Sequence, residues 1–132
     1  MRIAIDTNIL ISAILFPNSS MNELIKVIAE KHNLILSSFV IEELMGVVQR
    51  KFAGKEAAVD RFLSKFPYEM VYTPKEVRQD LFQIRDEKDY PILYTAIIED
   101  VDVLITGDRD FADIEIEKPE ILTPAQFLEK YC

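Results

Sequence analysis

The stretch IAIDTNIL, residues 3–10, decides how this chain folds. Its apolar start ends in a polar triplet, Asp-Thr-Asn at residues 6–8, and apolar residues then resume at once. Continuous apolar runs are typical of strands buried on both faces of a parallel sheet. We therefore predict a strand over residues 2–6 and a helix over residues 7–15 that starts directly from it. The triplet then lies at the carboxyl end of a strand, where open α/β sheets bind their ligands.

The rest of the chain alternates short apolar runs with segments of helical periodicity. Strands are expected at residues 33–37, 102–106 and 120–122, and residues 69–73 fit either a strand or an extended link. Helices are expected at residues 39–51, 55–66 and 90–100, the last apolar nearly all round and therefore buried. Strands separated by helices predict an α/β fold, with a central parallel sheet of four to five strands flanked by helices. Residues 1–132 are expected to form one domain.

Local capping signals place further helix starts. Ser20 with Glu23 resembles a capping box at the start of another amphipathic helix. Residues 73–76, Thr-Pro-Lys-Glu, combine a cap, a proline at the first helical position and an acid at the third, and predict a helix start. Residues 123–126, Thr-Pro-Ala-Gln, predict the last helix by the same logic. Between them, residues 107–112 are expected to form a turn with up to one turn of helix.

Composition excludes several classes of protein. With 49% hydrophobic and 29% charged residues, the chain has a soluble globular composition rather than a disordered one. No apolar run approaches the roughly 18–20 residues that cross a bilayer, so no membrane is expected. The start Met1-Arg2-Ile3 favours a first strand over a leader peptide. The single Cys132 can form no internal disulfide, which favours a cytoplasmic location.

The net charge of −8 has two interpretations. Simple nucleic-acid binders usually carry a basic surface, so this acidity argues against that class. The plainer interpretation is that the charge keeps the protein in solution. The alternative is that some of the acids form a site whose charge is neutralised by metal ions.

The placement of the acids favours a metal site. Six acids follow an expected strand or open an expected helix: Asp6, Glu42, Glu43, Asp89, Asp108 and Asp110. Two like charges about 4 Å apart repel by about 4 kcal/mol at an effective dielectric constant of about 20, so such a cluster takes up protons or cations. Oxygen ligands without nearby histidine or cysteine select Mg²⁺ or Mn²⁺.

Each acid also has an ordinary structural explanation. Asp6 and Asp108 suit turns, and Asp89 suits a helix cap, because Pro91 follows near the first helical position. Glu42 and Glu43 suit the positive end of a helix dipole. These explanations do not account for the fact that all of the acids fall at one end of the expected sheet.

Taken together, these segments resemble the PIN domain family. This family comprises metal-dependent ribonucleases and includes the VapC-type toxins of bacterial and archaeal toxin–antitoxin pairs. The segments that carry the resemblance run the length of the chain and read IAIDTNIL, SSFVIEEL, DEKDYPILYTAI, VDVLITGDRDF and TPAQFL. The triplet alone would be weak, whereas the blocks in order and at these spacings are specific. The resemblance implies a three-layer PIN-like fold.

The resemblance also implies which side chains form the site. The implied catalytic and metal-binding acids are Asp6, Glu43, Asp89 and Asp108, with Asp110 as a further ligand or supporting acid, and with Asn8 and Thr106 holding carboxylates or the attacking water by hydrogen bonds. Glu43 is preferred to Glu42 because the family's glutamate directly precedes an aliphatic residue. Asp89 is preferred to Asp86 because its spacing to Ala96 fits the family's pattern.

The implied activity is endonucleolytic hydrolysis of RNA phosphodiesters with one or two Mg²⁺ or Mn²⁺ ions. The implied partners are an RNA substrate, a cognate antitoxin protein and a second copy of the chain in a homodimer. This chemistry needs no side-chain nucleophile, and the only histidine, His32, is expected at the surface away from the acids.

One segment has the charge to contact RNA or an acidic partner. Residues 50–65 carry a local net charge of +3, from Arg50, Lys51, Lys55, Arg61 and Lys65 against Glu56 and Asp60. An ordinary solvated helix face explains it equally well. The apolar residues Ile11, Ile14 and Phe16 are candidates for a dimer or antitoxin contact, or for the core.

Two other functions compete with a ribonuclease. A PIN-like domain without catalysis would bind RNA or a protein only, but all four acids are present here. A receiver-type or phosphoryl-transfer domain that uses Asp6 would want a second carboxylate two residues on, where this chain has Asn8. We therefore rank the second alternative last.

Overall fold

A computed structural model of the protein describes residues 1–76, 78, 80–84, 87–111 and 114–131. Within these residues, five strands form one parallel sheet in the order β3-β2-β1-β4-β5. The strands are β1 (Arg2–Ile5), β2 (Asn33–Ser37), β3 (Tyr68–Val71), β4 (Val103–Ile105) and β5 (Glu120–Leu122). The α/β fold expected from the sequence is confirmed, and the ambiguous segment near residue 70 is an edge strand.

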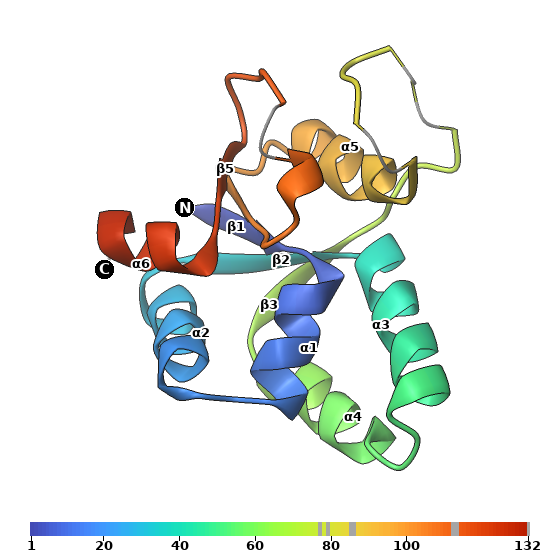
Figure 1. Ribbon diagram of the computed structural model, residues 1–132, viewed down its shortest axis with the longest axis vertical. Helices are drawn as coiled ribbons and strands as arrows, with labels where there is room; N and C mark the ends of the chain where they lie inside the picture. The colour runs from blue at the N-terminus through green and yellow to red at the C-terminus, as the bar shows by residue number, and fades with distance from the viewer. Residues whose placement is uncertain (77, 79, 85–86, 112–113, 132) are drawn as a thin grey trace.

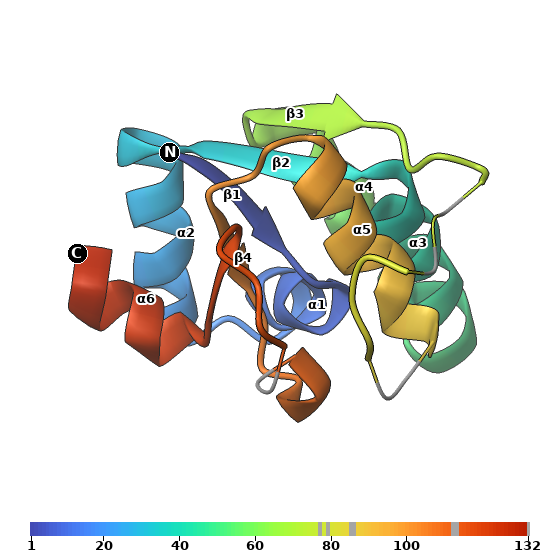
Figure 2. The ribbon, with the colours of Figure 1, turned by 90° about the horizontal axis from the view of Figure 1, so that it is seen from above.

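Helices cover both faces of this sheet. They are α1 (Thr7–Leu15), α2 (Ser19–Lys31), α3 (Ser38–Lys51), α4 (Glu56–Lys65), α5 (Tyr90–Ile98) and α6 (Pro124–Tyr131), with short 3₁₀ turns η1 (Glu87–Asp89) and η2 (Arg109–Phe111). Figure 1 shows α5 on one side of the sheet and α1, α2, α3 and α4 on the other, so the molecule has three layers. Seen from above, β1 and β2 run towards the same edge of the sheet, and α1 and α3 begin at that edge (Figure 2). Among the described residues, no helix combines the length and apolar character that a bilayer crossing requires.

The central strands supply the core on both faces. Ile3 and Ile5 of β1 are buried against the four-helix side, while the small Ala4 between them faces α5. Small side chains let α5 approach the sheet, and Ala96 of α5 is itself buried there. Burial of α5 through most of its length explains why its sequence is apolar nearly all round.

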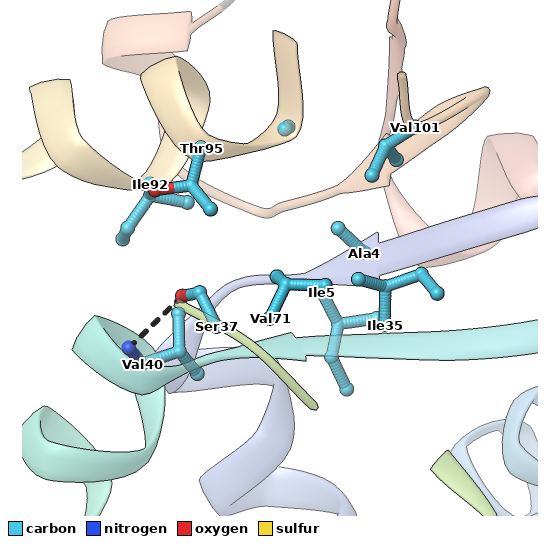
Figure 3. A pocket seen from close by; sticks show the side chains of 10 residues that line it. Ala4, Ile5, Ile35, Ser37, Val40, Val71, Ile92, Thr95 and Val101 are labelled. Atoms are coloured by element: carbon cyan, nitrogen blue, oxygen red, sulfur yellow. Dashed lines mark hydrogen bonds between the residues drawn. The ribbon is translucent and has the colours of Figure 1, made fainter. Parts of the chain in front are cut away.

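A small cavity of about 10 Å³ remains between α5 and the sheet. Figure 3 looks into it, with Ile92 and Thr95 of α5 on one side and Ser37 and Val71 on the other. This volume is about the room that one water molecule needs. The cavity is too small for a substrate, and none of the candidate acids lines it.

The predicted start of the second helix is wrong. Asn18, not Ser20, is the N-cap of α2: its side-chain oxygen accepts a hydrogen bond from the Met21 N–H at 2.9 Å. Asparagine caps helices as well as serine does, and Asn18 has the extended backbone of a capping residue. Ser20 therefore lies inside the first turn of α2.

The predicted helix start at residues 73–76 is also wrong, because these residues are not helical. The Thr73 N–H donates to the Ser38 hydroxyl at 3.0 Å, and the Thr73 hydroxyl accepts from Thr95 at 3.0 Å. The groups that would cap a helix instead tie the chain beyond β3 to α3 and α5. Three residues considered in the sequence, Asp86, Ala112 and Cys132, lie outside the described residues.

The last helix begins as predicted. The Thr123 N–H donates to the Gln126 side-chain oxygen at 2.9 Å, and the Gln126 N–H donates to the Thr123 hydroxyl at 3.1 Å. This reciprocal pair is a capping box at the start of α6. The helical turn expected after β4 is η2.

Candidate metal centre

Three carboxylates gather beyond the ends of the strands. Asp89, Asp108 and Asp110 each offer an oxygen, and these oxygens all lie within 4.8 Å of one another. Asp89 comes from the junction of η1 and α5, whereas the other two come from the loop after β4. The Asp110 N–H donates to a carboxylate oxygen of Asp108 at 2.9 Å, which fixes the turn that carries both side chains. Segments distant in the sequence therefore place three half-buried acids around one point.

Asp6 lies next to this group at the end of the central strand. Its backbone N–H donates to the Ile105 carbonyl at 3.1 Å, which extends the pairing of β1 with β4. One carboxylate oxygen accepts from the Ile9 N–H at 2.9 Å and caps α1, and the other accepts from the Thr106 hydroxyl. The same hydroxyl accepts from the Asp108 N–H at 3.0 Å. Thr106 thus connects Asp6 to the segment that holds Asp108.

Burial makes the charge of Asp6 costly. The side chain is only 4% exposed, and this burial is the main cause that raises the pKa of Asp6. The hydrogen bonds from Thr106 and Ile9 act in the opposite direction, while the nearby charges of Asp108 and Glu43 raise the pKa further. A buried carboxylate beside other carboxylates favours the uptake of a proton or a cation.

Glu43 reaches the site from α3. It is half-buried and accepts a hydrogen bond from the hydroxyl of Thr7, the buried first residue of α1. Its neighbour Glu42 is exposed to solvent. The sequence assigned no role to Thr7, although it stands in the opening polar triplet. Asn8, the third member of that triplet, is exposed in the first turn of α1, and its role as a hydrogen-bond donor to the site stays a prediction.

Three of the five predicted acids therefore form one group, and the other two lie near it. Asp89, Asp108 and Asp110 lie within reach of a single ion, Asp6 adjoins them through Thr106, and Glu43 contacts Thr7 beside Asp6. Carboxylate oxygens are hard ligands, and the group contains no nitrogen or sulfur donor. Such a donor set fits Mg²⁺ or Mn²⁺.

The candidate RNA-binding cations lie away from the acids. Arg50 and Lys51 occupy the last turn of α3, and Lys55 is the N-cap residue of α4; all three are exposed. Lys51 follows Glu43 by eight residues on α3, or about 12 Å along the helix axis. Their role in RNA binding stays a prediction.

The apolar candidates on α1 have separate environments. Ile11 belongs to the core, and Phe16 is 55% exposed with its ring against Phe52 at 5.3 Å. Ile14 lines an open groove of about 400 Å³ between α1 and α4, together with Phe62 and other side chains.

Comparisons with known proteins agree with this geometry. A model of the PIN domain family matches residues 2–110, a span that includes all five candidate acids. The uncharacterized protein MJ1680 of Methanocaldococcus jannaschii is 25% identical over 144 residues, which cover 98% of this chain and 91% of that protein. The fold is similar to that of a chain in the crystal structure of VapBC2 from Rickettsia felis bound to a DNA fragment from their promoter. That match has a TM-score of 0.72 and 26% identity, and covers 92% of this chain and 97% of the other. Because the family match extends over most of its length, this chain belongs to the PIN domain family.

Proposed function

We propose that this protein is a divalent-metal-dependent endoribonuclease that hydrolyses RNA phosphodiesters as the toxin of a toxin–antitoxin pair. The observation that carries the proposal is the group of Asp89, Asp108 and Asp110 beside the buried Asp6, in a chain whose family consists mostly of nucleases. The likeness to a chain of VapBC2 supports the toxin role, and with it a cognate antitoxin as partner. A homodimer remains part of the proposal.

The acids would act by holding one or two ions of Mg²⁺ or Mn²⁺. A bound divalent ion supplies Lewis acidity towards the phosphate and lowers the pKa of a coordinated water. Asp89, Asp108 and Asp110 would bind the cation directly, and this neutralises charge that would otherwise repel the RNA backbone. Thr106 and the Ile9 N–H hold both oxygens of Asp6, so its carboxylate is fixed in one orientation beside the centre.

A side-chain nucleophile is not needed for this chemistry. His32 directly precedes β2, whereas Asp6 directly follows β1. Because these strands are parallel, His32 lies at the opposite end of the sheet from the acids. His32 is therefore too far from the acids to take part in the reaction, which agrees with hydrolysis by a water molecule at an ion that the carboxylates hold.

Cleavage assays with matched variants test the proposal. We expect the metal-stripped protein to cut RNA when Mn²⁺ or Mg²⁺ is added and to stop when EDTA is added. Asp6→Asn and Asp108→Asn should reduce cleavage to background while the far-ultraviolet circular dichroism stays unchanged. Glu42→Gln, at an exposed neighbour of the site, is the control and should cut RNA at the wild-type rate.

Metal binding can be measured separately from cleavage. An ion that binds only the folded protein stabilises it by about 2.7 kcal/mol at 100 times its dissociation constant, so the melting temperature should rise with Mn²⁺. The rise should be smaller in Asp108→Asn. A melting-temperature rise without cleavage would favour the alternative, a PIN-like module that only binds RNA or protein. The absence of both at millimolar ion concentrations would contradict the proposed function.

A further inference from the structure

A second pocket opens directly beside the acids. It has a volume of about 210 Å³ and lies between the carboxyl ends of β4 and β5 and the start of α6. Thr106 and Asp108 line it and also belong to the candidate metal centre. The Thr106 N–H donates to the Leu122 carbonyl at 2.9 Å, which fixes the floor where the two strands meet. Any group that enters this pocket therefore lies next to Asp108.

The walls of the pocket combine apolar surface with fixed polar groups. Ile121 and Leu122 are half-buried and supply the apolar part. Thr123 and Gln126 supply the polar part, and their capping box holds both side chains in place. In that box the Gln126 oxygen and the Thr123 oxygen accept backbone N–H groups. The Gln126 amide hydrogens and the Thr123 hydroxyl hydrogen are therefore available as donors to a ligand.

A cation completes the pocket. Arg109 lines it from η2 and is exposed, one residue from Asp108 in the sequence. A guanidinium group is well suited to a phosphate, which it binds through two parallel hydrogen bonds. The pocket thus combines a cation that can bind a phosphate, apolar walls and hydrogen-bond donors.

We propose that this pocket binds the RNA nucleotide next to the bond that is cut and selects its base. The inference rests on the proposed ribonuclease function. Pockets for drug-sized ligands occupy about 300–1,000 Å³, so this smaller one suits a single base. The base lies against Ile121 and Leu122, and Arg109 contacts its phosphate. Because Gln126 presents donors, the pocket favours guanine and uracil, which carry a carbonyl oxygen at purine C6 or pyrimidine C4, over adenine and cytosine, which carry an amino group at that position.

The substitution Gln126→Glu isolates this selection. Glutamate at the third helical position forms a capping box with threonine as glutamine does, so the start of α6 is retained. The donors of the amide, however, become acceptors. We expect the wild-type protein with Mn²⁺ to prefer guanine or uracil at one position flanking the cut in a randomised RNA pool. In Gln126→Glu the ratio of these two bases to adenine and cytosine should fall by about tenfold, since one well-placed base contact contributes about 1–3 kcal/mol of discrimination.

Two further variants separate the parts of the pocket. Arg109→Gln should raise KM several-fold without changing the base preference, because a phosphate contact carries no sequence information. Glu129→Gln, at an exposed position further along α6, is the matched control and should cut with the wild-type preference. Unchanged base preference in Gln126→Glu would overturn the inference and leave the nuclease assignment standing.

A binding measurement keeps the inference testable if no cleavage is seen. In the presence of Mg²⁺, the four ribonucleoside 5′-monophosphates are titrated into ¹⁵N-labelled protein. The signals followed are the side-chain amide of Gln126 and the backbone amide of Gly107, which also lines the pocket. We expect larger shifts with guanosine and uridine monophosphate than with the other two. Absence of wild-type cleavage would refute the proposed function, whereas unperturbed Gln126 and Gly107 signals with all four nucleotides would refute the pocket.

Discussion

Two threonine hydroxyls set the orientation of the acids. Thr106 joins Asp6 to the Asp108 segment, and Thr7 donates to Glu43. Both threonines are buried, so water cannot easily replace them as donors. Groups that hold metal ligands in place commonly matter to a site almost as much as the ligands themselves.

Thr7 provides a direct test of this arrangement. Thr7→Val keeps the shape of the side chain but removes the donor to Glu43, so we expect the affinity for Mn²⁺ to fall by about 10- to 100-fold. Thr7→Ser retains the hydroxyl and should bind Mn²⁺ nearly as the wild type does. Isothermal titration calorimetry measures both affinities. Equal affinity in the valine variant would show that Glu43 does not depend on Thr7.

A second residue gives the fold a dependence on pH. The Arg2 backbone N–H donates to Asp102 at 2.8 Å, and this bond, together with the ion pair to Lys118, lowers the pKa of Asp102. A depressed pKa in the folded state means stability that is present above the unfolded value and is lost as pH falls through the folded value. Asp102→Asn should therefore lower the melting temperature at pH 7, and this deficit should shrink below about pH 4. An equal deficit at both pH values would argue against the charge as its cause.

Helix starts are the elements at which local signals and the fold compete. The start of α2 is a clear example, because Asn18 caps it although Ser20 also fits the pattern. Asn18→Ala should lower the free energy of unfolding by about 1 kcal/mol, the usual loss for a removed cap. Ser20→Ala is the matched control and should leave stability unchanged within about 0.5 kcal/mol. Urea denaturation measures both free energies of unfolding. A larger loss of stability in Ser20→Ala than in Asn18→Ala would favour Ser20 as the cap, as expected from the sequence.

The predictable elements are those whose signals are local. The bounds of α1 could be predicted because Asp6 both ends a strand and caps the next helix. Residues 73–76 carry equally good local signals and are not helical, because Thr73 bonds to Ser38 and Thr95. Those partners are adjacent only in the folded chain, so no local pattern contains them.

The same distinction applies to the candidate site. Alternation of strands and helices was enough to expect the acids at one edge of the sheet. It could not show that Asp110 groups with Asp89 and Asp108, or that Asp6 adjoins them through Thr106. Nor could it show the bond from Thr7 to Glu43, which depends on how α1 packs against α3. Such contacts follow from side-chain placement between elements rather than from sequence spacing.

At the scale of the whole molecule, charge is distributed unevenly. The protein has a net charge of −8, yet residues 50–65 carry +3. Under the proposed function, repulsion by the acidic protein would weaken the approach of RNA, and a local basic segment at the far end of α3 would offset this repulsion.

The basic segment can be tested by neutralising it. We expect the triple variant Arg50→Gln, Lys51→Gln and Lys55→Gln to raise KM for RNA several-fold with kcat unchanged, because phosphate contacts contribute binding to ground state and transition state alike. Lys26→Gln with Lys31→Gln, on α2, is the control with exposed cations elsewhere. If both sets change KM equally, the effect comes from net charge and not from this segment.

The parallel pairing of β1 with β4 also governs when the acids can meet. Asp6 precedes its hydroxyl donor Thr106 by 100 residues along the chain. A growing chain therefore carries Asp6 and Glu43 before it carries Asp89, Asp108 and Asp110. Any fragment that ends before Asp89 lacks all three of the carboxylates that gather at the candidate metal centre.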